Sequence, residues 1–336
     1  MHDICIVGLG AIGAFYALAL ERSGEARVTA VCRSNFSVVS QYGLEVVSDR
    51  LGTCHWKPHR VCANPAEAAD RDYRFIICVT KALPDVTRTS KLLAPLLTST
   101  TTFVLIQNGV DIHLDMQEAC PGADIISSCS WSDATAVDGG RKVVQTGPDG
   151  LTSGLHVKDI ENPSTAGQYS LELLHSLLVK GGVGSEITNN IVAARWKKVL
   201  WNAAISTVCT VTRSPVASIL SAEMLPSMLP VLQDLMKEVI AVARAEGVTV
   251  GDLSDDAPEA VLKNCLQQYS DTCNSNPSLF KPSMLVDLEA GRPMEVEPIV
   301  GSVVRAGRRH EVRTPKLDVL YAQLRVLQWG LLKGRR

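Results

Sequence analysis

The chain has 336 residues, of which 46% are hydrophobic, 20% are charged and 5% are aromatic. This composition predicts a folded globular protein with enough apolar residues for two domains, and it excludes a disordered or fibrous chain. Its 33 Lys and Arg against 35 Asp and Glu give a formal net charge of -2, so the sequence lacks the basic excess of a nucleic-acid-binding surface.

The cysteines and the first residues indicate the environment of the protein. None of the ten cysteines forms a C-x-x-C pair and many lie in apolar runs, which predicts reduced core residues. Cys and His cluster most closely within residues 54–62, without the spacing of a zinc site, so no metal is expected. Residues 1–3 lack the basic segment of a signal peptide, and no apolar run approaches the roughly 18 to 20 residues of a membrane-spanning helix. We therefore expect a cytoplasmic protein that binds neither nucleic acid nor a membrane.

The first 140 residues alternate short apolar runs with stretches of helical periodicity. Strands are expected at the apolar runs 4–7, 28–32, 75–79 and 102–106. Helical spacing runs from residue 11 to about 21 and again over about 86–97. Because a strand, a helix and a second strand in this order form a right-handed crossover, the sheet should be parallel. The alternation is typical of an α/β fold with a doubly wound, Rossmann-type sheet.

The pattern changes near residue 140. Residues 142–145 and 151–155 flank the turn sequence 147–150, Gly-Pro-Asp-Gly, which predicts a hairpin of antiparallel strands. After about residue 186 strand patterns nearly vanish, so we expect one domain over residues 1–186 and an all-helical domain over 187–336. Its helices are expected at 191–207, 223–246, 257–269, 283–290 and 315–332, with a Ser/Asn/Pro-rich loop over 270–282.

Residues 8–13 carry the G-x-G-x-x-G spacing between the first predicted strand and the first predicted helix. Gly8 permits a tight turn, Gly10 lets the backbone approach a pyrophosphate, and Gly13 lets the helix pack closely on the strand. The helix N-terminus adds free N–H groups and the positive end of the helix dipole. We expect a dinucleotide-binding site here, against the alternative of a purely structural glycine turn.

The end of the second strand indicates which dinucleotide binds. A carboxylate at this point would bind the 2'-hydroxyl of the adenine ribose, whereas an arginine pairs with a 2'-phosphate. The sequence reads Val31-Cys32-Arg33-Ser34 and offers no carboxylate. Arg33 and the Ser34 hydroxyl therefore predict NADPH rather than NADH, with a solvated surface arginine as the alternative.

Further motifs carry a resemblance to a known family. They are Thr80-Lys81 and Gln107-Asn108-Gly109 after the third and fourth strands, Arg195-Trp196-Lys197-Lys198-Val199-Leu200-Trp201-Asn202, Ser283-Met284-Leu285-Val286-Asp287, and Glu295. With the glycine motif, the chain resembles the ketopantoate reductases, also called 2-dehydropantoate 2-reductases, over nearly its whole length. The resemblance implies a Rossmann-type NADP-binding domain followed by an all-helical domain of the 6-phosphogluconate dehydrogenase C-terminal-like type.

The resemblance also implies catalytic and substrate-binding roles. Lys198 would be the general acid in the reduction of a 2-oxo acid, because hydride transfer builds negative charge on the carbonyl oxygen. Asn202 lies four residues on, on the same helical face, where it would bind substrate or hold the lysine, and Ser206 continues that face. Glu295 would keep the lysine oriented and charged, and Ser283 would bind the substrate carboxylate.

The cofactor contacts that the motif and the resemblance imply are Gly8, Leu9, Gly10, Ala11, Ile12, Gly13, Arg33, Lys81, Asn108, Ala134 and Glu295. Asp287 is interpreted either as a helix-stabilising group or as a group that supports the site residues from behind. A lysine on a helix is most often a solvated surface residue, and the sequence alone does not choose between Lys197 and Lys198. The resemblance favours Lys198.

Two departures from the family pattern leave the substrate open. Ser206-Thr207 stands where the family commonly has Asn-Pro, and residues 214–216 stand where a further Asn often contacts pantoate hydroxyls. Ketopantoate is the expected substrate, but a D-2-hydroxyacid dehydrogenase or a specialised-pathway reductase of another branched oxo acid stays open, since a site without those polar groups discriminates less. A catalytically silent NADPH-binding sensor is the alternative from another class. Apolar faces on 224–242 and 319–332 also leave a homodimer open.

Overall fold

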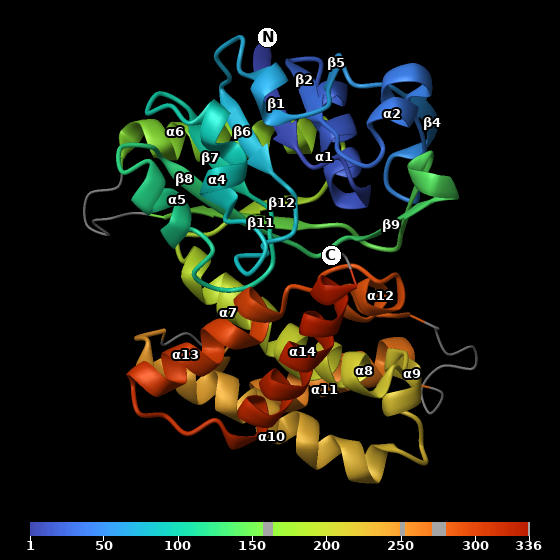
Figure 1. Ribbon diagram of the computed structural model, residues 1–336, viewed down its shortest axis with the longest axis vertical. Helices are drawn as coiled ribbons and strands as arrows, with labels where there is room; N and C mark the ends of the chain where they lie inside the picture. Colours follow the sequence, from blue (N-terminus) through green and yellow to red (C-terminus); the bar gives the residue numbers. More distant parts are fainter. Residues whose placement is uncertain (157–163, 249–252, 271–279, 335–336) are drawn as a thin grey trace. The chain divides into compact units, whose positions relative to one another are not determined.

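A computed structural model describes residues 1–156, 164–248, 253–270 and 280–334. The chain divides into two compact units, whose elements are labelled in Figure 1. The first unit comprises Met1–Ala82, Thr87–Gln107 and Ile112–Ile191, and the second comprises Leu83–Val86, Asn108–Asp111 and Val192–Arg336. Two short loops of the N-terminal half thus belong to the second unit.

An eight-stranded sheet forms the centre of the first unit, in the order β12-β11-β8-β7-β6-β1-β2-β5. Its strands are β1 (His2–Val7), β2 (Ala26–Val31), β5 (Arg60–Cys62), β6 (Phe75–Cys78), β7 (Thr102–Leu105), β8 (Ile125–Ser130), β11 (Leu151–Leu155) and β12 (Ser185–Ile187). The six neighbouring strands β5, β2, β1, β6, β7 and β8 are parallel, while β11 is antiparallel to β8 and parallel to β12. All four predicted strands are present, and the doubly wound parallel sheet is confirmed.

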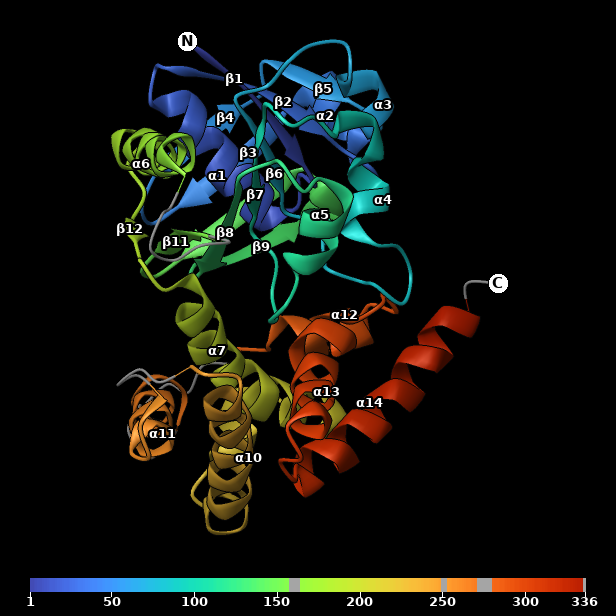
Figure 2. The same ribbon diagram turned by 90° about the vertical axis from the view of Figure 1, so that its left-hand side faces the viewer.

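Alternate side chains of the parallel strands enter two different cores. Ile4 and Ile6 of β1 pack into a core shared with helices α1 and α6, whereas Cys5 and Val7 face a core shared with α3, α4 and α5. Figure 2 shows helices on both faces of this sheet. The helices are α1 (Ala11–Arg22), α2 (Phe36–Tyr42), α3 (Pro65–Ala68), α4 (Thr89–Leu93), α5 (Leu114–Ala119) and α6 (Thr165–Lys180), with 3-10 turns at Ala94–Leu96 and Asp138–Gly140.

The helix predicted over 86–97 is shorter than expected. α4 begins at Thr89, and a 3-10 turn that contains Pro95 replaces its last predicted turn. Pro95 has no N–H to continue the α-helical hydrogen bonds, which explains the change. The preceding loop, Leu83–Val86, belongs to the second unit.

The hairpin predicted across residues 147–150 is wrong. β10 pairs with β9 and β3 in a separate four-stranded sheet of order β4-β3-β10-β9, whereas β11 pairs with β8 and β12. That sheet contains β3 (Leu44–Ser48), β4 (Gly52–Trp56), β9 (Asp133–Val137) and β10 (Lys142–Thr146). The turn instead connects the two sheets. Its backbone groups pair outside the turn: Gly147 N donates to Asp49 at 2.7 Å, and Gly150 O accepts from Trp131 N at 2.8 Å. The antiparallel character is correct, but with other partners.

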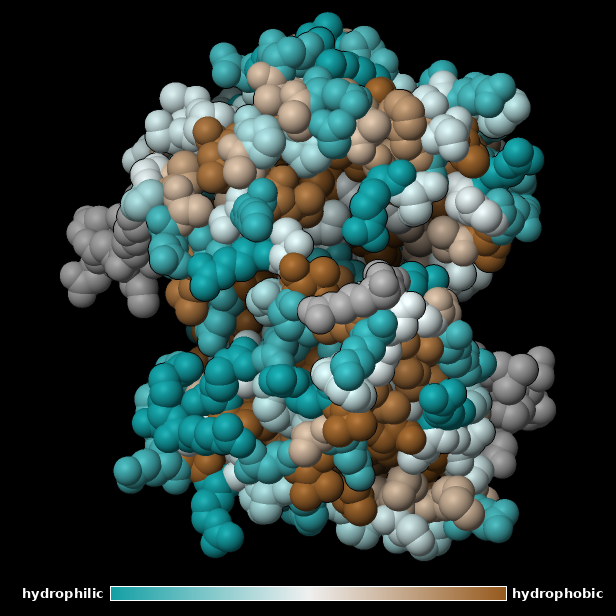
Figure 3. Space-filling view, viewed as in Figure 1, coloured by the Kyte–Doolittle hydropathy of each residue, from teal (hydrophilic) through white to brown (hydrophobic). Residues whose placement is uncertain are grey.

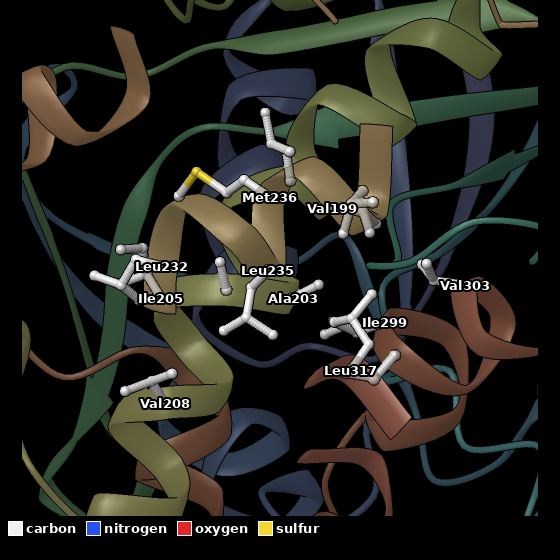
Figure 4. Close-up of a cluster of buried hydrophobic side chains, with 14 of the residues drawn as sticks. Val199, Ala203, Ile205, Val208, Leu232, Leu235, Met236, Ile299, Val303 and Leu317 are labelled. Atoms are coloured by element: carbon white, nitrogen blue, oxygen red, sulfur yellow. The ribbon is translucent and has the colours of Figure 1, made fainter. Parts of the chain in front are cut away.

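The regular elements of the second unit are all helices in its described residues, as predicted. Its elements are α7 (Ile191–Trp201), α8 (Thr207–Thr212), α9 (Val216–Ile219), α10 (Leu225–Ala245), α11 (Ala257–Tyr269), α12 (Ser283–Glu289), α13 (Ser302–Arg309) and α14 (Pro315–Lys333), with π-helical turns η3 (Asn202–Ser206) and η5 (Glu297–Gly301). Figure 4 shows part of its core, where Val199 and Ala203 lie with Leu235, Met236 and Ile299. Most of the loop predicted over 270–282 lies outside the described residues.

Two further predictions concern the cysteines and membrane segments. The nine described cysteines are free and seven of them are buried, in agreement with reduced core residues, and Cys273 lies outside the described residues. Within the described part of the chain, no helix combines the length and apolar character needed to cross a membrane.

Candidate active site

The glycine motif lies at the point where the strand order of the large sheet reverses. From β1 the chain moves to β2 on one side, and it later returns to β6 on the other side. The loop 8–13 follows β1 and Thr80-Lys81 follows β6, so both lie at the carboxyl ends of adjacent parallel strands. Open α/β sheets bind their ligands at this position.

The three glycines have different local requirements. Gly8 has φ +102°, and a Cβ there would lie 2.8 Å from the backbone N of Thr80. A Cβ on Gly13 would lie 2.1 Å from Gly8 O. Gly10, the N-cap of α1, has no atom within 4 Å of its Cβ position. Gly8 and Gly13 are therefore needed by the fold itself, whereas Gly10 leaves open space beside the free N–H groups of the helix start, which fits a diphosphate.

The segment after β2 is attached to this loop by a residue that the sequence did not single out. Asn35 Nδ2 donates to Leu9 O at 2.8 Å, immediately after the exposed Arg33 and Ser34. No described residue forms a hydrogen bond or ion pair with the Arg33 guanidinium. In the sequence, the feature that could have pointed to this contact is the position of Asn35 directly after Arg33-Ser34. The structure thus brings Arg33 to the glycine loop with its charge exposed.

The other predicted cofactor contacts of the first unit lie in two places. Lys81 is exposed after β6, and the neighbouring Thr80 O accepts a hydrogen bond from Gln107 Nε2 at 2.9 Å. Ala134 lies elsewhere, on the edge strand β9 of the four-stranded sheet, where it pairs with Gln145. Its strand, β9, also packs against α1, the helix that follows the glycine loop.

The two lysines of α7, in the second unit, differ in their exposure to solvent. Lys197 is exposed, whereas Lys198 is partly buried in the last turn of the helix. Asn202 is also partly buried, and Ser206 is 2% exposed. The candidate general acid, Lys198, is therefore the less exposed of the two lysines.

A π-helical turn follows Lys198, where the sequence predicted a regular helix. Asn202 begins this turn and Ser206 ends it. In a straight α-helix, four residues overshoot one full turn by about 40°, so residues spaced by four drift around the axis. A π turn contains more residues than an α-helical turn, so each residue rotates less about the helix axis. Ser206 therefore stays nearer the face that carries Lys198 and Asn202. Such turns are frequent at functional sites.

Asn108 and Glu295 lie together in the second unit. Asn108 Nδ2 donates to Glu295 Oε2 at 2.9 Å, and Glu295 is 5% exposed. Glu295 stands two residues before the second π turn, η5. A predicted cofactor contact and a predicted catalytic acid are thus direct partners.

The α12 segment contributes an exposed hydroxyl and a structural acid. Ser283 is the first residue of α12 and is exposed, and α12 packs against η3 and α8. Asp287 is 1% exposed, and its Oδ1 accepts from Arg292 Nε at 3.0 Å. This ion pair supports the interpretation of Asp287 as a helix-stabilising group.

The fold and these residues define a class of protein. A Rossmann-type sheet with a glycine loop at its switch point, joined to a helical unit that holds a half-buried lysine and a buried carboxylate, is the construction of a dinucleotide-dependent oxidoreductase. Two family models match: "Ketopantoate reductase PanE/ApbA" over residues 4–157 and "Ketopantoate reductase PanE/ApbA C terminal" over residues 190–328. The chain belongs to the ketopantoate reductase family, oxidoreductases that act on CH–OH groups with a nicotinamide dinucleotide.

Individual relatives resemble the chain over nearly its full length. The crystal structure of a 2-dehydropantoate 2-reductase from Methylococcus capsulatus is 30% identical with a TM-score of 0.79, covering 98% of this chain and 97% of that one. A 2-dehydropantoate 2-reductase from Geobacter metallireducens is 25% identical with a TM-score of 0.82, covering 96% and 99%. An uncharacterized protein of Saccharomyces cerevisiae is 28% identical, covering 100% of this chain and 96% of that protein.

Proposed function

We propose that the chain reduces 2-dehydropantoate (ketopantoate) to pantoate with NADPH, with Lys198 as the general acid. The main support is the match of two family models. One matches residues 4–157, which include the open space at Gly10, and the other matches residues 190–328, which include the half-buried Lys198. In this proposal residues 1–186 hold the cofactor and residues 187–336 hold the substrate and the catalytic groups.

The cofactor is held by the glycine loop and by the groups around it. The proposed contacts are Gly8, Leu9, Gly10, Ala11, Ile12, Gly13, Arg33, Lys81, Asn108, Ala134 and Glu295. When bound, the cofactor supplies the hydride. The exposed guanidinium of Arg33 pairs with the 2'-phosphate, which selects NADPH over NADH.

The helical unit supplies the proton and the polar contacts. Lys198 Nζ donates its proton to the carbonyl oxygen of the 2-oxo acid as negative charge develops there. The Asn202 amide holds the same oxygen or the lysine without adding charge. The Ser206 and Ser283 hydroxyls bind substrate, and Glu295, held by Asn108, keeps Lys198 oriented and charged.

The test is NADPH oxidation by the purified protein with a panel of 2-oxo acids that includes ketopantoate, repeated with NADH. Fast, Lys198-dependent turnover of ketopantoate is expected. Turnover of less hydroxylated oxo acids alone would assign the chain to a re-purposed reductase, with Ser206 and residues 214–216 as the altered positions. Tight NADPH binding without any oxidation would favour the sensor function and contradict the proposal.

We place the reaction in pantothenate biosynthesis in the cytoplasm, supported by the relatives that are 2-dehydropantoate 2-reductases. Expression of the chain should restore growth without added pantothenate to cells that lack their own ketopantoate reductase. Cell fractionation should recover the protein with cytoplasmic markers. Failure to restore growth, with the protein present and folded, would contradict this assignment.

We also propose a homodimer formed through α14. Val319, Val326 and Trp329 lie on one face of this helix and are 58%, 67% and 59% exposed. Ala322 and Gly330 stand four residues on either side of Val326, so two antiparallel copies of α14 could cross closely there. Figure 3 shows apolar residues gathered over α14 and α8. Sedimentation should show a dimer that Trp329→Lys dissociates, and a wild-type monomer at all concentrations would contradict the proposal.

A further inference from the structure

The loop of residues 108–111 is held within the helical unit at three successive positions. Asn108 Nδ2 donates to Glu295 Oε2 at 2.9 Å, and Gly109 O accepts from Arg195 Nη1 at 2.9 Å. Val110 N donates to Pro298 O at 3.1 Å, while its side chain enters the hydrophobic core. The side chain or backbone of each residue therefore has a fixed partner.

Gly109 is the point of closest approach in this loop. Its φ is +98°, and a Cβ there would lie 2.3 Å from Pro298 O and 2.5 Å from Pro298 Cβ. The peptide therefore lies directly on the π turn η5, in a conformation that favours glycine. Because Asn108 is the preceding residue, the orientation of the Gly109 peptide sets the direction from which the Asn108 side chain reaches Glu295.

Arg195 is the side chain that fixes this peptide from the other side. It is 3% exposed and lies on α7 three residues before Lys198, so the two residues are neighbours on the helix surface. Burial of a guanidinium carries a desolvation cost that an apolar side chain of similar volume would avoid. The hydrogen bond to Gly109 O gives a reason for a cation at this position.

We propose that Arg195 is a positioning residue for the reaction: it holds Gly109 O and thereby directs Asn108 toward Glu295. The inference rests on the proposed function, in which Asn108 and Glu295 take part in the site. Arg195 itself acts through the loop and need not touch the substrate. The residue also connects the helix of the general acid to the segment that carries the Asn108–Glu295 pair.

A double-mutant cycle tests this action through Asn108. Arg195→Met should lower kcat/KM by about 10- to 100-fold, the loss expected from misplacement of a site group by about 1 Å. In an Asn108→Ala background the same substitution should lower kcat/KM less than about 3-fold, because the group that Arg195 directs is gone. Arg195→Lys should recover part of the activity, since it retains a cationic donor. Equal losses in both backgrounds would overturn the proposal.

Arg244→Met is the control, because Arg244, an exposed arginine, also donates from Nη2 to a backbone carbonyl, that of Leu253, at 3.1 Å. It should leave kcat/KM unchanged within about 3-fold. If Arg195→Met does not fold, Arg195→Lys replaces it in the cycle. Coupling of the Arg195 variant with Asn108→Ala is then still expected, and its absence would overturn the proposal.

Hydrogen exchange of the cofactor-free protein provides a measurement that does not depend on activity. Arg195→Met should speed exchange of the Val110 amide, which donates to Pro298 O, by about 10-fold or more, and Arg244→Met should not. Unchanged exchange at Val110 would overturn the proposal. Wild-type protein that reduces no 2-oxo acid would instead refute the proposed function, and the exchange result would still decide whether Arg195 holds the loop.

Discussion

Asn108 and Glu295 are joined by a 2.9 Å hydrogen bond although 187 positions separate them in the sequence. Asn108 belongs to the motif Gln107-Asn108-Gly109, whose first residue bonds to Thr80 O within the sheet-containing unit. Two consecutive residues of one motif are thus fixed by different units. The boundary between the two units therefore falls within the motif, between Gln107 and Asn108.

Replacement of Lys198 should abolish most turnover without loss of cofactor binding. Lys198→Ala removes the proposed proton donor, and we expect kcat to fall by about 100- to 10,000-fold. Lys197→Ala is the control, because this neighbour is exposed and should change kcat by less than about 2-fold. Stopped-flow turnover and NADPH fluorescence titration measure the two effects. Similar kcat values for the two variants would exclude Lys198 as the general acid.

Substitution of two glycines of the loop should affect folding and cofactor binding differently. Gly13→Ala places a Cβ 2.1 Å from Gly8 O, and we expect the free energy of unfolding to fall by about 1 to 3 kcal/mol. Gly10→Ala meets no atom within 4 Å, so its free energy of unfolding should change by less than about 1 kcal/mol. The added methyl group should nevertheless weaken NADPH binding by about 10-fold or more.

Urea unfolding and NADPH titration of both glycine variants provide the measurements. The decisive observation is the Gly10→Ala protein, which should unfold like the wild type and bind NADPH poorly. Wild-type affinity in that variant would show that the diphosphate does not approach Gly10.

Several elements with a clear local pattern could be predicted, whereas strand pairing between distant segments could not. The glycine motif and α11 follow from local spacing and from the start signal at residues 256–258, and α11 has the predicted bounds. β3 and β4 were not predicted, although they form a local hairpin around residues 49–51. The partners predicted for β10 were wrong because β3 pairs with β10 from almost 100 residues away. Pairing over such a distance leaves no local pattern.

The site residues show the same division. Their identities came from motifs, but their environments depend on packing between elements. A period of 3.6 residues does not reveal the π turn that begins at Asn202, and it cannot show that Lys198 is partly buried while Lys197 is exposed. The role of Arg195 likewise depends on Gly109, which lies 86 positions earlier in the sequence.

Arg33 should determine the choice between NADPH and NADH. Loss of a charge-assisted contact to the 2'-phosphate corresponds to about 1.5 to 3 kcal/mol, so Arg33→Ala should lower kcat/KM for NADPH by about 10- to 100-fold. The value for NADH should stay the same, because NADH has no 2'-phosphate. Arg27→Ala is the matched control, since Arg27 on β2 pairs with Asp3. An unchanged NADPH to NADH ratio in Arg33→Ala would show that Arg33 is a solvated surface residue.

The buried thiol of Cys265 should make the protein less stable at high pH. Burial raises its pKa from the usual 9.0 to about 11, although the hydrogen bond donated by Trp201 Nε1 partly opposes this shift. Above pH 9 the unfolded chain therefore loses a proton that the folded chain keeps, and stability falls until the folded thiol ionises near pH 11. The slope for one thiol is about 1.4 kcal/mol per pH unit.

Urea unfolding between pH 8 and pH 11 measures this contribution in the wild type, Cys265→Ala and Cys54→Ala. Cys265→Ala should start less stable because it leaves a small cavity, but its stability should fall less steeply above pH 9 than that of the wild type. Cys54→Ala provides the comparison with a thiol that is only partly buried. Identical slopes in all three proteins would show that ionisation of Cys265 is not coupled to unfolding. A flatter slope in Cys265→Ala alone would identify this thiol, which accepts a hydrogen bond from Trp201 on the helix of Lys198, as one source of the alkaline limit of the fold.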